Sequence, residues 1–155
     1  MARYTILVVN GPNLGHIGVR QPEIYGTDTL ESVPALVKGL LGPKTKEVKL
    51  SFFQSNAEGA LIDRLEQARA EKASGIVLNA GALTHTSLAL ADCLAWIGVP
   101  CVEVHLSNAL SRTDEPLRQK SLLGRHCVGL VAGFGVLGYA LAVLALHRRL
   151  SAGRR

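Results

Sequence analysis

The sequence predicts a doubly wound α/β fold built on one five-stranded parallel sheet. Short apolar runs rich in β-branched residues alternate with longer segments of helical periodicity, and this alternation repeats five times along the 155 residues. The first run, residues 5–10, is apolar almost throughout, as expected for a parallel strand buried on both faces. A chain of this length corresponds to about one domain. We therefore predict a single domain over residues 1–150 and a basic, frayed tail over residues 151–155.

The first strand and the first long helix are separated by an unusually long loop. TILVVN, residues 5–10, predicts the strand. LESVPALVKGLL, residues 30–41, predicts the helix, whose start is indicated by Asp28 and an acidic residue three positions later, with Pro34 tolerated near the first turn. Ordinary connections are about 4–6 residues long. NGPNLGHIGVRQPEIYG, residues 10–26, is much longer and therefore indicates a binding loop or a lid.

The rest of the chain continues the alternation. Four further apolar runs predict strands at residues 47–53, 75–79, 99–105 and 127–133. Three further segments with helical spacing predict helices at residues 55–72, 86–98 and 136–146. The helix of residues 55–72 begins with the N-cap residue Ser55, and that of residues 86–98 stops at Gly98. Joined by right-handed crossovers, these units give a flavodoxin-like or similar doubly wound domain.

The charge of the chain favours a small ligand over a nucleic acid. The formal net charge is +5, and the ending HRRLSAGRR supplies four arginines. With only three phenylalanines available for base stacking, this ending indicates a solvated tail rather than a nucleic-acid arm. A modest basic balance also fits an enzyme whose substrate is a small anion. We therefore expect no nucleic-acid partner.

Cysteine usage and the apolar segments predict a cytoplasmic protein without a membrane partner. Cys93, Cys101 and Cys127 form no CxxC pair and lie in apolar runs, which indicates buried free thiols in a reducing compartment. The opening MARYTILVVNG lacks the cleavage pattern of a signal peptide. Residues 128–146 carry no charge over nearly the length of a membrane span, but their four glycines fit better a buried strand that turns into a buried helix.

Polar side chains follow the first four predicted strands where each strand ends. The strand ends read NGPN, QSN, NAG followed by THTS, and EVHLSN. In open parallel sheets, ligands bind beyond the carboxyl ends of the strands. The amino ends of the strands show no such collection of polar residues. This asymmetry indicates an active site at the carboxyl edge of the sheet.

One motif suggests a nucleotide site but lies in the wrong place. GFGVLG, residues 133–138, matches GxGxxG, which in dinucleotide sites occupies the first βα turn and is followed about 20 positions later by an acidic residue. Here the motif lies in the last turn, and no Asp or Glu follows Glu115. We interpret these glycines as allowing close strand–helix packing or the close approach of a ligand.

Glu103 and His105 are candidate catalytic residues. Two apart on a predicted strand, they point to the same face, and a carboxylate beside an imidazole suits a general acid. A pair that satisfies itself in the core fits the spacing equally well, but the position at the strand's carboxyl end favours function. A metal site of His85, Asp92, Glu103 and His105 is disfavoured because no HExxH motif or cysteine cluster exists. A hydrolase triad with Ser107 is disfavoured because there is no GxSxG elbow.

The long loop carries Arg20 and Tyr25, which form a candidate general base. A free tyrosine has a pKa of about 10 and is a poor base at neutral pH. A guanidinium close by stabilises the phenolate, which would allow the pair to remove a carbon-bound proton. The residues alone favour the alternative, in which both side chains only pack the loop.

Six motifs in order and in register resemble type II 3-dehydroquinate dehydratase of the shikimate pathway. They are NGPNL, EIYG, QSNAEG, NAGALTHTS, EVHLSN and GFGVLGY, and the resemblance runs from about residue 6 to residue 146. It implies a flavodoxin-like subunit in a homododecamer built from four trimers. It also implies a trans-dehydration of 3-dehydroquinate to 3-dehydroshikimate through an enolate, without metal or cofactor, on the route to chorismate and aromatic amino acids.

The same resemblance implies roles for individual residues. Tyr25 would be the base, Arg20 would lower its pKa and stabilise the transition state, and Asn13 would hold the water that stabilises the enolate. His105, oriented by Glu103, would be the general acid. The implied substrate-binding residues are Asn79, His85, Leu106, Ser107 and Arg118, of which Leu106 and Ser107 act through the backbone, and Asp92, which reaches a neighbouring subunit's site.

The segment after EVHLSN departs from the family pattern, which has two arginines four residues apart. ALSRTDEPLRQKS places Arg112 and Arg118 six apart, as a short insertion would, so the sequence leaves open which of the two holds the substrate carboxylate. His16 stands where the family varies and is assigned no catalytic role. Two alternatives stay open: a flavodoxin-like module that binds a nucleotide or flavin, and an assembly homologue that has lost activity.

Overall fold

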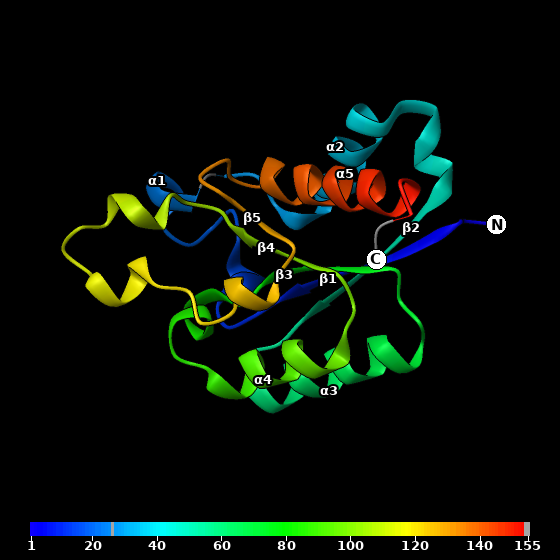
Figure 1. Ribbon diagram of the computed structural model, residues 1–155. Coiled ribbons are helices and arrows are strands. Elements are labelled where there is room, and N and C mark those ends of the chain that lie inside the picture. The colour runs from blue at the N-terminus through cyan, green and yellow to red at the C-terminus, as the bar shows by residue number, and fades with distance from the viewer. Residues whose placement is uncertain (26, 154–155) are drawn as a thin grey trace.

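The computed structural model of the protein describes residues 1–25 and 27–153, and of Tyr25 it describes the backbone only. Within these residues, five strands form one sheet in the order β2-β1-β3-β4-β5 (Figure 1). They are β1 (Tyr4–Asn10), β2 (Val48–Gln54), β3 (Gly75–Asn79), β4 (Cys101–His105) and β5 (Gly129–Ala132). All neighbouring strands are parallel. The predicted doubly wound parallel sheet is confirmed.

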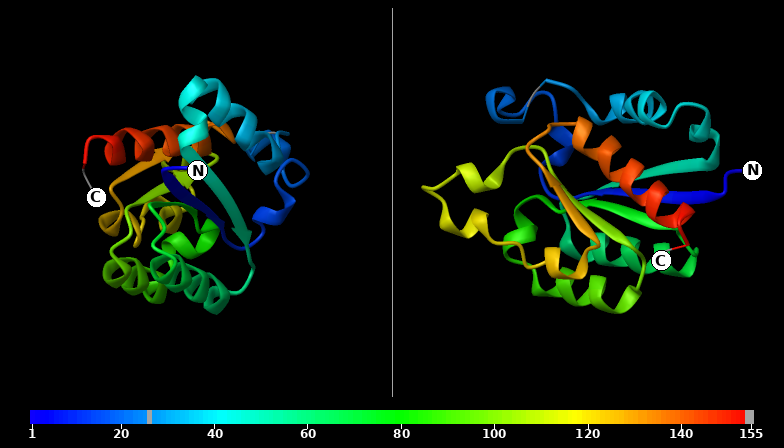
Figure 2. Two further views of the ribbon diagram at one scale, coloured as in Figure 1. Left: turned by 90° about the vertical axis from the view of Figure 1, so that its right-hand side faces the viewer. Right: turned by 45° about the horizontal axis from the view of Figure 1, so that its top comes forward.

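Helices cover both faces of the sheet. α2 (Val33–Leu41) and α5 (Leu137–Ser151) pack together on one face, and α3 (Glu58–Ala70) and α4 (Leu88–Ile97) pack together on the other (Figures 1 and 2). A one-turn helix, α1 (Pro22–Tyr25), lies within the long loop between β1 and α2. The loop is thus on the same side of the sheet as the α2 and α5 layer (Figure 1).

Alternation along β1 divides the apolar core into two clusters, one on each face of the sheet. Ile6 and Val8 are buried in the cluster that contains residues of α2 and α5, whereas Leu7 and Val9 are buried with residues of α3 and α4. Burying one such side chain contributes about 1.5–3 kcal/mol to folding. A strand that is apolar on both faces therefore contributes most to the free energy of folding when it lies at the centre of a sheet with helices on both faces.

Two predicted helix starts are wrong, because each expected capping residue lies too far before its helix. α2 begins at Val33, after a short 3₁₀ turn, and not at Asp28. α3 begins at Glu58, and the hydroxyl of Ser55 instead accepts a hydrogen bond from the backbone N–H of Ala57 at 3.0 Å. In both cases a turn of chain lies between the polar residue and the helix that it was expected to cap.

The fifth strand is the main correction to the predicted core. Residues 127–133 are predicted to be buried, but β5 is an edge strand and its Leu130 is 53 % exposed. Cys127, just before this strand, is only partly buried, whereas Cys93 and Cys101 are buried as predicted. The apolar residues of this segment are therefore divided: Leu130 lies on the surface, whereas Val131 and Cys127 pack against the core.

The final helix is longer than predicted. α5 continues beyond residue 146 to Ser151, so the predicted tail of residues 151–155 begins inside the helix, and residues 154–155 lie outside the described residues. Within residues 1–25 and 27–153, no helix combines the length and the apolar character needed to cross a membrane.

Candidate active site

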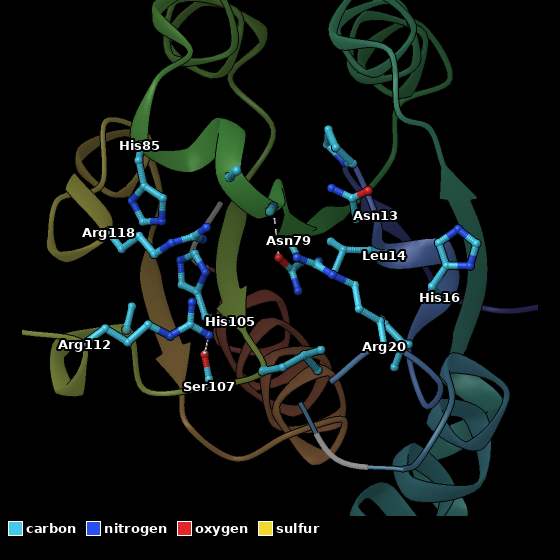
Figure 3. A pocket seen from close by; sticks show the side chains of 16 residues that line it. Asn13, Leu14, His16, Arg20, Asn79, His85, His105, Ser107, Arg112 and Arg118 are labelled. Carbon is cyan, nitrogen blue, oxygen red and sulfur yellow. Dashed lines mark hydrogen bonds between the residues drawn. The ribbon is translucent and has the colours of Figure 1, made fainter. Parts of the chain in front are cut away.

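A cavity of about 120 Å³ opens at the carboxyl ends of β1, β3 and β4 (Figure 3). A wider hollow, lined by residues of the long loop and of the segment after β4, adjoins it and shares several of its residues. Eight predicted site residues line the cavity: Asn13, Arg20, Asn79, His85, His105, Leu106, Ser107 and Arg118. The predicted polar ends of β1, β3 and β4 therefore meet in one place, whereas the QSN end of β2 does not line the cavity.

Close backbone contact between the loops after β1 and β3 forms one wall of the cavity. A Cβ at Gly11 would lie 2.5 Å from the carbonyl oxygen of Ala80, so only glycine fits at this position. The backbone N–H of Gly11 donates to the carbonyl oxygen of Asn79 at 2.8 Å. Asn13 has a left-handed backbone, φ 68°, and its N–H donates to Asn56 Oδ1 at 3.0 Å. These contacts hold Asn13 in the cavity wall.

A buried polar network lies beneath the cavity. The hydroxyl of Tyr139, on α5, donates to Asn10 Oδ1 at 2.5 Å and accepts a hydrogen bond from Asn79 Nδ2 at 2.9 Å. Asn79 Oδ1 accepts a further hydrogen bond from the backbone N–H of Gly81 at 3.1 Å. Burial raises the pKa of the Tyr139 hydroxyl, which therefore stays neutral. The network fixes the amide of Asn79, whose Nδ2 carries a second hydrogen for a ligand.

Glu103 and His105 lie side by side on β4, as their spacing predicts. Glu103 is fully buried, and its Oε1 lies 2.5 Å from Nε2 of His105, which is partly exposed to the cavity. Because a carboxylate oxygen accepts, Nε2 carries the hydrogen of this bond. The ring nitrogen Nδ1 is then the atom of His105 that exchanges a proton with a ligand. This arrangement suits a general acid.

His85 comes from the 3₁₀ helix Gly81–His85 after β3 and stands beside His105 (Figure 3). Their rings stack with centroids 6.2 Å apart and planes inclined by 18°. Nδ1 of His85 lies 2.6 Å from the carbonyl oxygen of Lys120, which can only accept, so Nδ1 carries a hydrogen. In the neutral ring, Nε2 of His85 is therefore an acceptor, suited to a substrate hydroxyl.

Three arginines give the cavity a positive field. Arg20 comes from the long loop, and Arg112 and Arg118 come from the segment after β4. Nη2 of Arg112 donates to Ser107 Oγ at 3.0 Å, and Arg118 is paired with Glu115. Guanidinium groups of this kind suit a carboxylate ligand. The short insertion between Arg112 and Arg118 thus leaves both side chains at the cavity.

The family model described as dehydroquinase class II matches residues 4–147 of the chain. The chain belongs to this family. The 3-dehydroquinate dehydratase of Prochlorococcus marinus is 50% identical over 140 residues, which are 88% of this chain and 89% of the relative. The catabolic 3-dehydroquinase of Botryotinia fuckeliana is 47% identical over 143 residues, 92% of each chain. The crystal structure of type II dehydroquinase from Butyrivibrio crossotus matches with a TM-score of 0.84 at 38% identity, covering 94% of this chain and 98% of that one.

The relatives of this dehydroquinase bear the names of enzymes, so the alternatives of a binding module or an inactive assembly protein receive no support. GFGVLG forms the turn from β5 into α5, where Gly133 and Gly135 have φ values of 95° and 57°. A Cβ at Gly138, on α5, would lie 3.5 Å from Cγ1 of Val104 on β4 and of Val131 on β5, which fits the predicted close strand–helix packing. Within the described part of the chain, no three His, Cys, Asp or Glu side chains gather as a metal site would require.

Three predicted site residues of the dehydroquinase are not among those described in the cavity wall. Glu103 is fully buried and reaches the cavity only through its bond to His105. The side chain of Tyr25 lies outside the described residues, although its backbone ends α1. Asp92 is exposed on α4 and does not line the cavity of its own chain. The roles of Tyr25 as base and of Asp92 towards a neighbouring subunit stay predictions.

The sequence did not indicate the residues that support this dehydroquinase site by hydrogen bonds to Glu103 and Asn79. Ser121 donates to Glu103 Oε2 at 2.8 Å, and Tyr139 joins Asn10 to Asn79. Asn10 carries a weak signal, because it is a polar residue at the end of an otherwise apolar strand. Ser121 carries none, since a serine in a polar loop has no pattern that distinguishes it.

Proposed function

We propose that the protein dehydrates 3-dehydroquinate to 3-dehydroshikimate by trans elimination through an enolate. The observation that carries the proposal is the buried Glu103 beside His105 in a cavity lined by three arginines, in a chain whose relatives include a 3-dehydroquinate dehydratase. The arginines attract and orient an anionic substrate, and the histidine supplies the acid that an elimination of water needs. The reaction removes one proton and one hydroxyl from neighbouring carbons of the substrate.

The acid half of the reaction is assigned to His105. With Nε2 bonded to Glu103, protonated His105 presents Nδ1–H to the departing hydroxyl, which leaves as water. The buried carboxylate of Glu103 accepts this hydrogen bond, so it fixes the ring and stabilises the imidazolium. A positioned acid of this kind contributes about 10²–10⁴-fold to a rate.

The base half is assigned to Tyr25, with Arg20 favouring its phenolate form. The phenolate removes the proton next to the ketone, and the resulting enolate is stabilised by a water that Asn13 holds. Arg20 and Asn13 both line the cavity, and α1 ends at Tyr25 in the same loop. This assignment explains the length of the loop. The loop must carry the base over the substrate and then return to α2.

The substrate is held by groups at the ends of two strands, β3 and β4, and in the segments that follow them. We assign its hydroxyls to Asn79 and His85, and its carboxylate to the backbone N–H groups of Leu106 and Ser107 together with an arginine. Arg118 is the choice favoured by the family pattern, and Arg112 stands close by through its bond to Ser107. Backbone N–H groups and a guanidinium provide complementary donors for both carboxylate oxygens.

We also propose that twelve copies assemble as four trimers, with Asp92 reaching a neighbouring site. The exposed apolar side chains along β5 and the turn after it support assembly: Val128, Leu130 and Phe134. Sedimentation of the purified protein tests this, with Leu130→Asp expected to lower the mass of the particle. A wild-type monomer at micromolar concentration would contradict the proposal.

We place the reaction in the cytoplasm, in the shikimate pathway towards aromatic amino acids. The three cysteines are free thiols, two of them buried, which fits a reducing compartment.

The reaction itself is tested by mixing chelator-treated protein with 3-dehydroquinate and following the near-ultraviolet absorbance of the conjugated enone product. Tyr25→Phe and His105→Gln are each expected to lower kcat by about 100-fold or more. Tyr4→Phe is the matched control, since the Tyr4 hydroxyl lies near Ser151 at the far end of α5 and outside the cavity. A flat trace from folded wild-type protein would refute the proposed function.

A further inference from the structure

The buried carboxylate of Glu103 is held by two different partners, one on each oxygen. Oε1 binds His105, whereas Oε2 accepts a hydrogen bond from the hydroxyl of Ser121 at 2.8 Å. Ser121 is 18 residues further along the chain, in the segment that leads from the cavity to β5. Glu103 is fully buried, so a donor on Oε2 replaces the water that an exposed carboxylate would have.

The direction of the Ser121 hydroxyl is fixed by its other contacts. Ser121 Oγ accepts hydrogen bonds from the backbone N–H of Leu123 at 3.1 Å and of Gly124 at 2.9 Å. A hydroxyl has two acceptor sites and one hydrogen. Because both acceptor sites are occupied by backbone donors, the hydrogen is left for Oε2 of Glu103. The turn at residues 121–124 therefore aims one O–H group at the carboxylate.

The backbone of the same turn approaches Glu103 closely. A Cβ added at Gly124 would lie 3.0 Å from Glu103 Oε2 and 3.3 Å from Ser121 Oγ. The neighbouring residues also hold the second histidine, since the carbonyl of Lys120 accepts from His85 Nδ1 and the N–H of Leu122 donates to the carbonyl of Thr84 at 2.9 Å. One short stretch of chain thus sets the orientation of both His85 and His105.

We propose that Ser121 is a positioning residue for the general acid, acting through Glu103 on His105. This inference rests on the proposed function. The hydroxyl stabilises the negative charge of Glu103 and locks the rotation of its carboxylate, so that Oε1 stays directed at His105 Nε2. Without the hydroxyl, the carboxylate turns towards the backbone donors that Ser121 vacates, and it stabilises the imidazolium of His105 less. Ser121 itself is not among the residues that line the cavity.

Ser121→Ala is the first test. We expect kcat to fall by about 10- to 100-fold, as for the loss of a hydrogen bond to a charged group. KM should stay within about threefold, because the substrate contacts remain in place. We further expect the alkaline limb of the pH profile of kcat to move to lower pH, since the imidazolium loses part of the stabilisation that the directed carboxylate gives it. Ser121→Thr keeps the hydroxyl and should restore kcat to within about threefold of the wild type.

Ser74→Ala is the matched control. The Ser74 hydroxyl also accepts a backbone hydrogen bond, from Thr5 N at 3.1 Å, but it lies at the opposite edge of the sheet, before β3. We expect its loss to leave kcat and the pH profile unchanged. Thermal unfolding of each variant shows whether a lower kcat is due to loss of folded protein.

A double-mutant cycle decides whether Ser121 acts through Glu103. In a Glu103→Gln background, Ser121→Ala should lower kcat by less than about threefold, because the group that it positions is already lost. The same four proteins should show coupling in thermal stability, a readout that does not depend on activity. An equal loss of kcat in both backgrounds, an unmoved pH profile or a failed rescue by Ser121→Thr in an active wild type would overturn this inference alone. An inactive wild type would instead overturn the proposed function.

Discussion

Removal of one hydroxyl group beneath the cavity, by Tyr139→Phe, should destabilise the whole domain. The change keeps the ring and its packing but leaves Asn10 Oδ1 and Asn79 Nδ2 without the partner that joins them. Turning the Asn10 amide over does not help, because its Nδ2 is already buried with no hydrogen-bond partner among the described residues. Each newly unpaired buried polar group costs about 1–3 kcal/mol, so the pair costs about 2–6 kcal/mol.

Thermal unfolding followed by circular dichroism measures this loss at a fixed protein concentration. For a protein of this size, 1 kcal/mol corresponds to about 2–4 °C in Tm, so we expect Tm to fall by about 4 °C or more. Tyr4→Phe is the control, because the Tyr4 hydroxyl lies 3.5 Å from Ser151 Oγ and loses little. If Tyr139→Phe melts at the same temperature as Tyr4→Phe, the network does not carry the stability that its burial indicates.

Three further predictions concern other parts of the chain. The hydrogen bond from His147 lowers the pKa of Glu47 in the folded protein. The pair therefore stabilises the fold fully at pH values above the unfolded pKa of glutamate, about 4.3, and this stabilisation is lost as the pH falls through the lowered pKa of Glu47 in the folded protein. Urea unfolding of wild type and Glu47→Gln should therefore differ at pH 7 and converge in acid. Gly11→Ala would place a methyl group 2.5 Å from the carbonyl oxygen of Ala80, and kcat and Tm should both fall, as steady-state assays and calorimetry would show. Burial raises the pKa of Cys93 to about 11, so mass spectrometry after iodoacetamide at pH 8 should find this thiol unmodified in folded protein and labelled in urea.

Local features of the fold could be predicted from the sequence because their causes are local. Gly98 ends α4 with φ 68°, where a residue without a Cβ has no steric penalty. The pairing of Glu103 with His105 follows from a separation of two residues on one strand. The positions of the polar residues after the strands were also sufficient to place the cavity at the carboxyl edge of the sheet, since parallel strands bring all their carboxyl ends to one edge.

The supporting contacts could not be predicted, because they join distant parts of the chain. Tyr139 and Asn10 are 129 residues apart, and no spacing rule relates them. The exposure of Leu130 was mispredicted for a different reason: apolar composition shows that a strand is to be covered, but not whether the same chain covers it. The helix starts failed at Asp28 and Ser55 because a short polar residue favours turns as readily as helix caps.

The network of Asn10, Asn79 and Tyr139 also determines the side from which a substrate can arrive. It ties β1, β3 and α5 together beneath the cavity, and amide hydrogens in such a core exchange with solvent only when the whole domain unfolds. The wider hollow beside the cavity lies instead between the long loop and the segment after β4. We therefore expect substrate and product to pass through this hollow and not through the side of the cavity that the network closes.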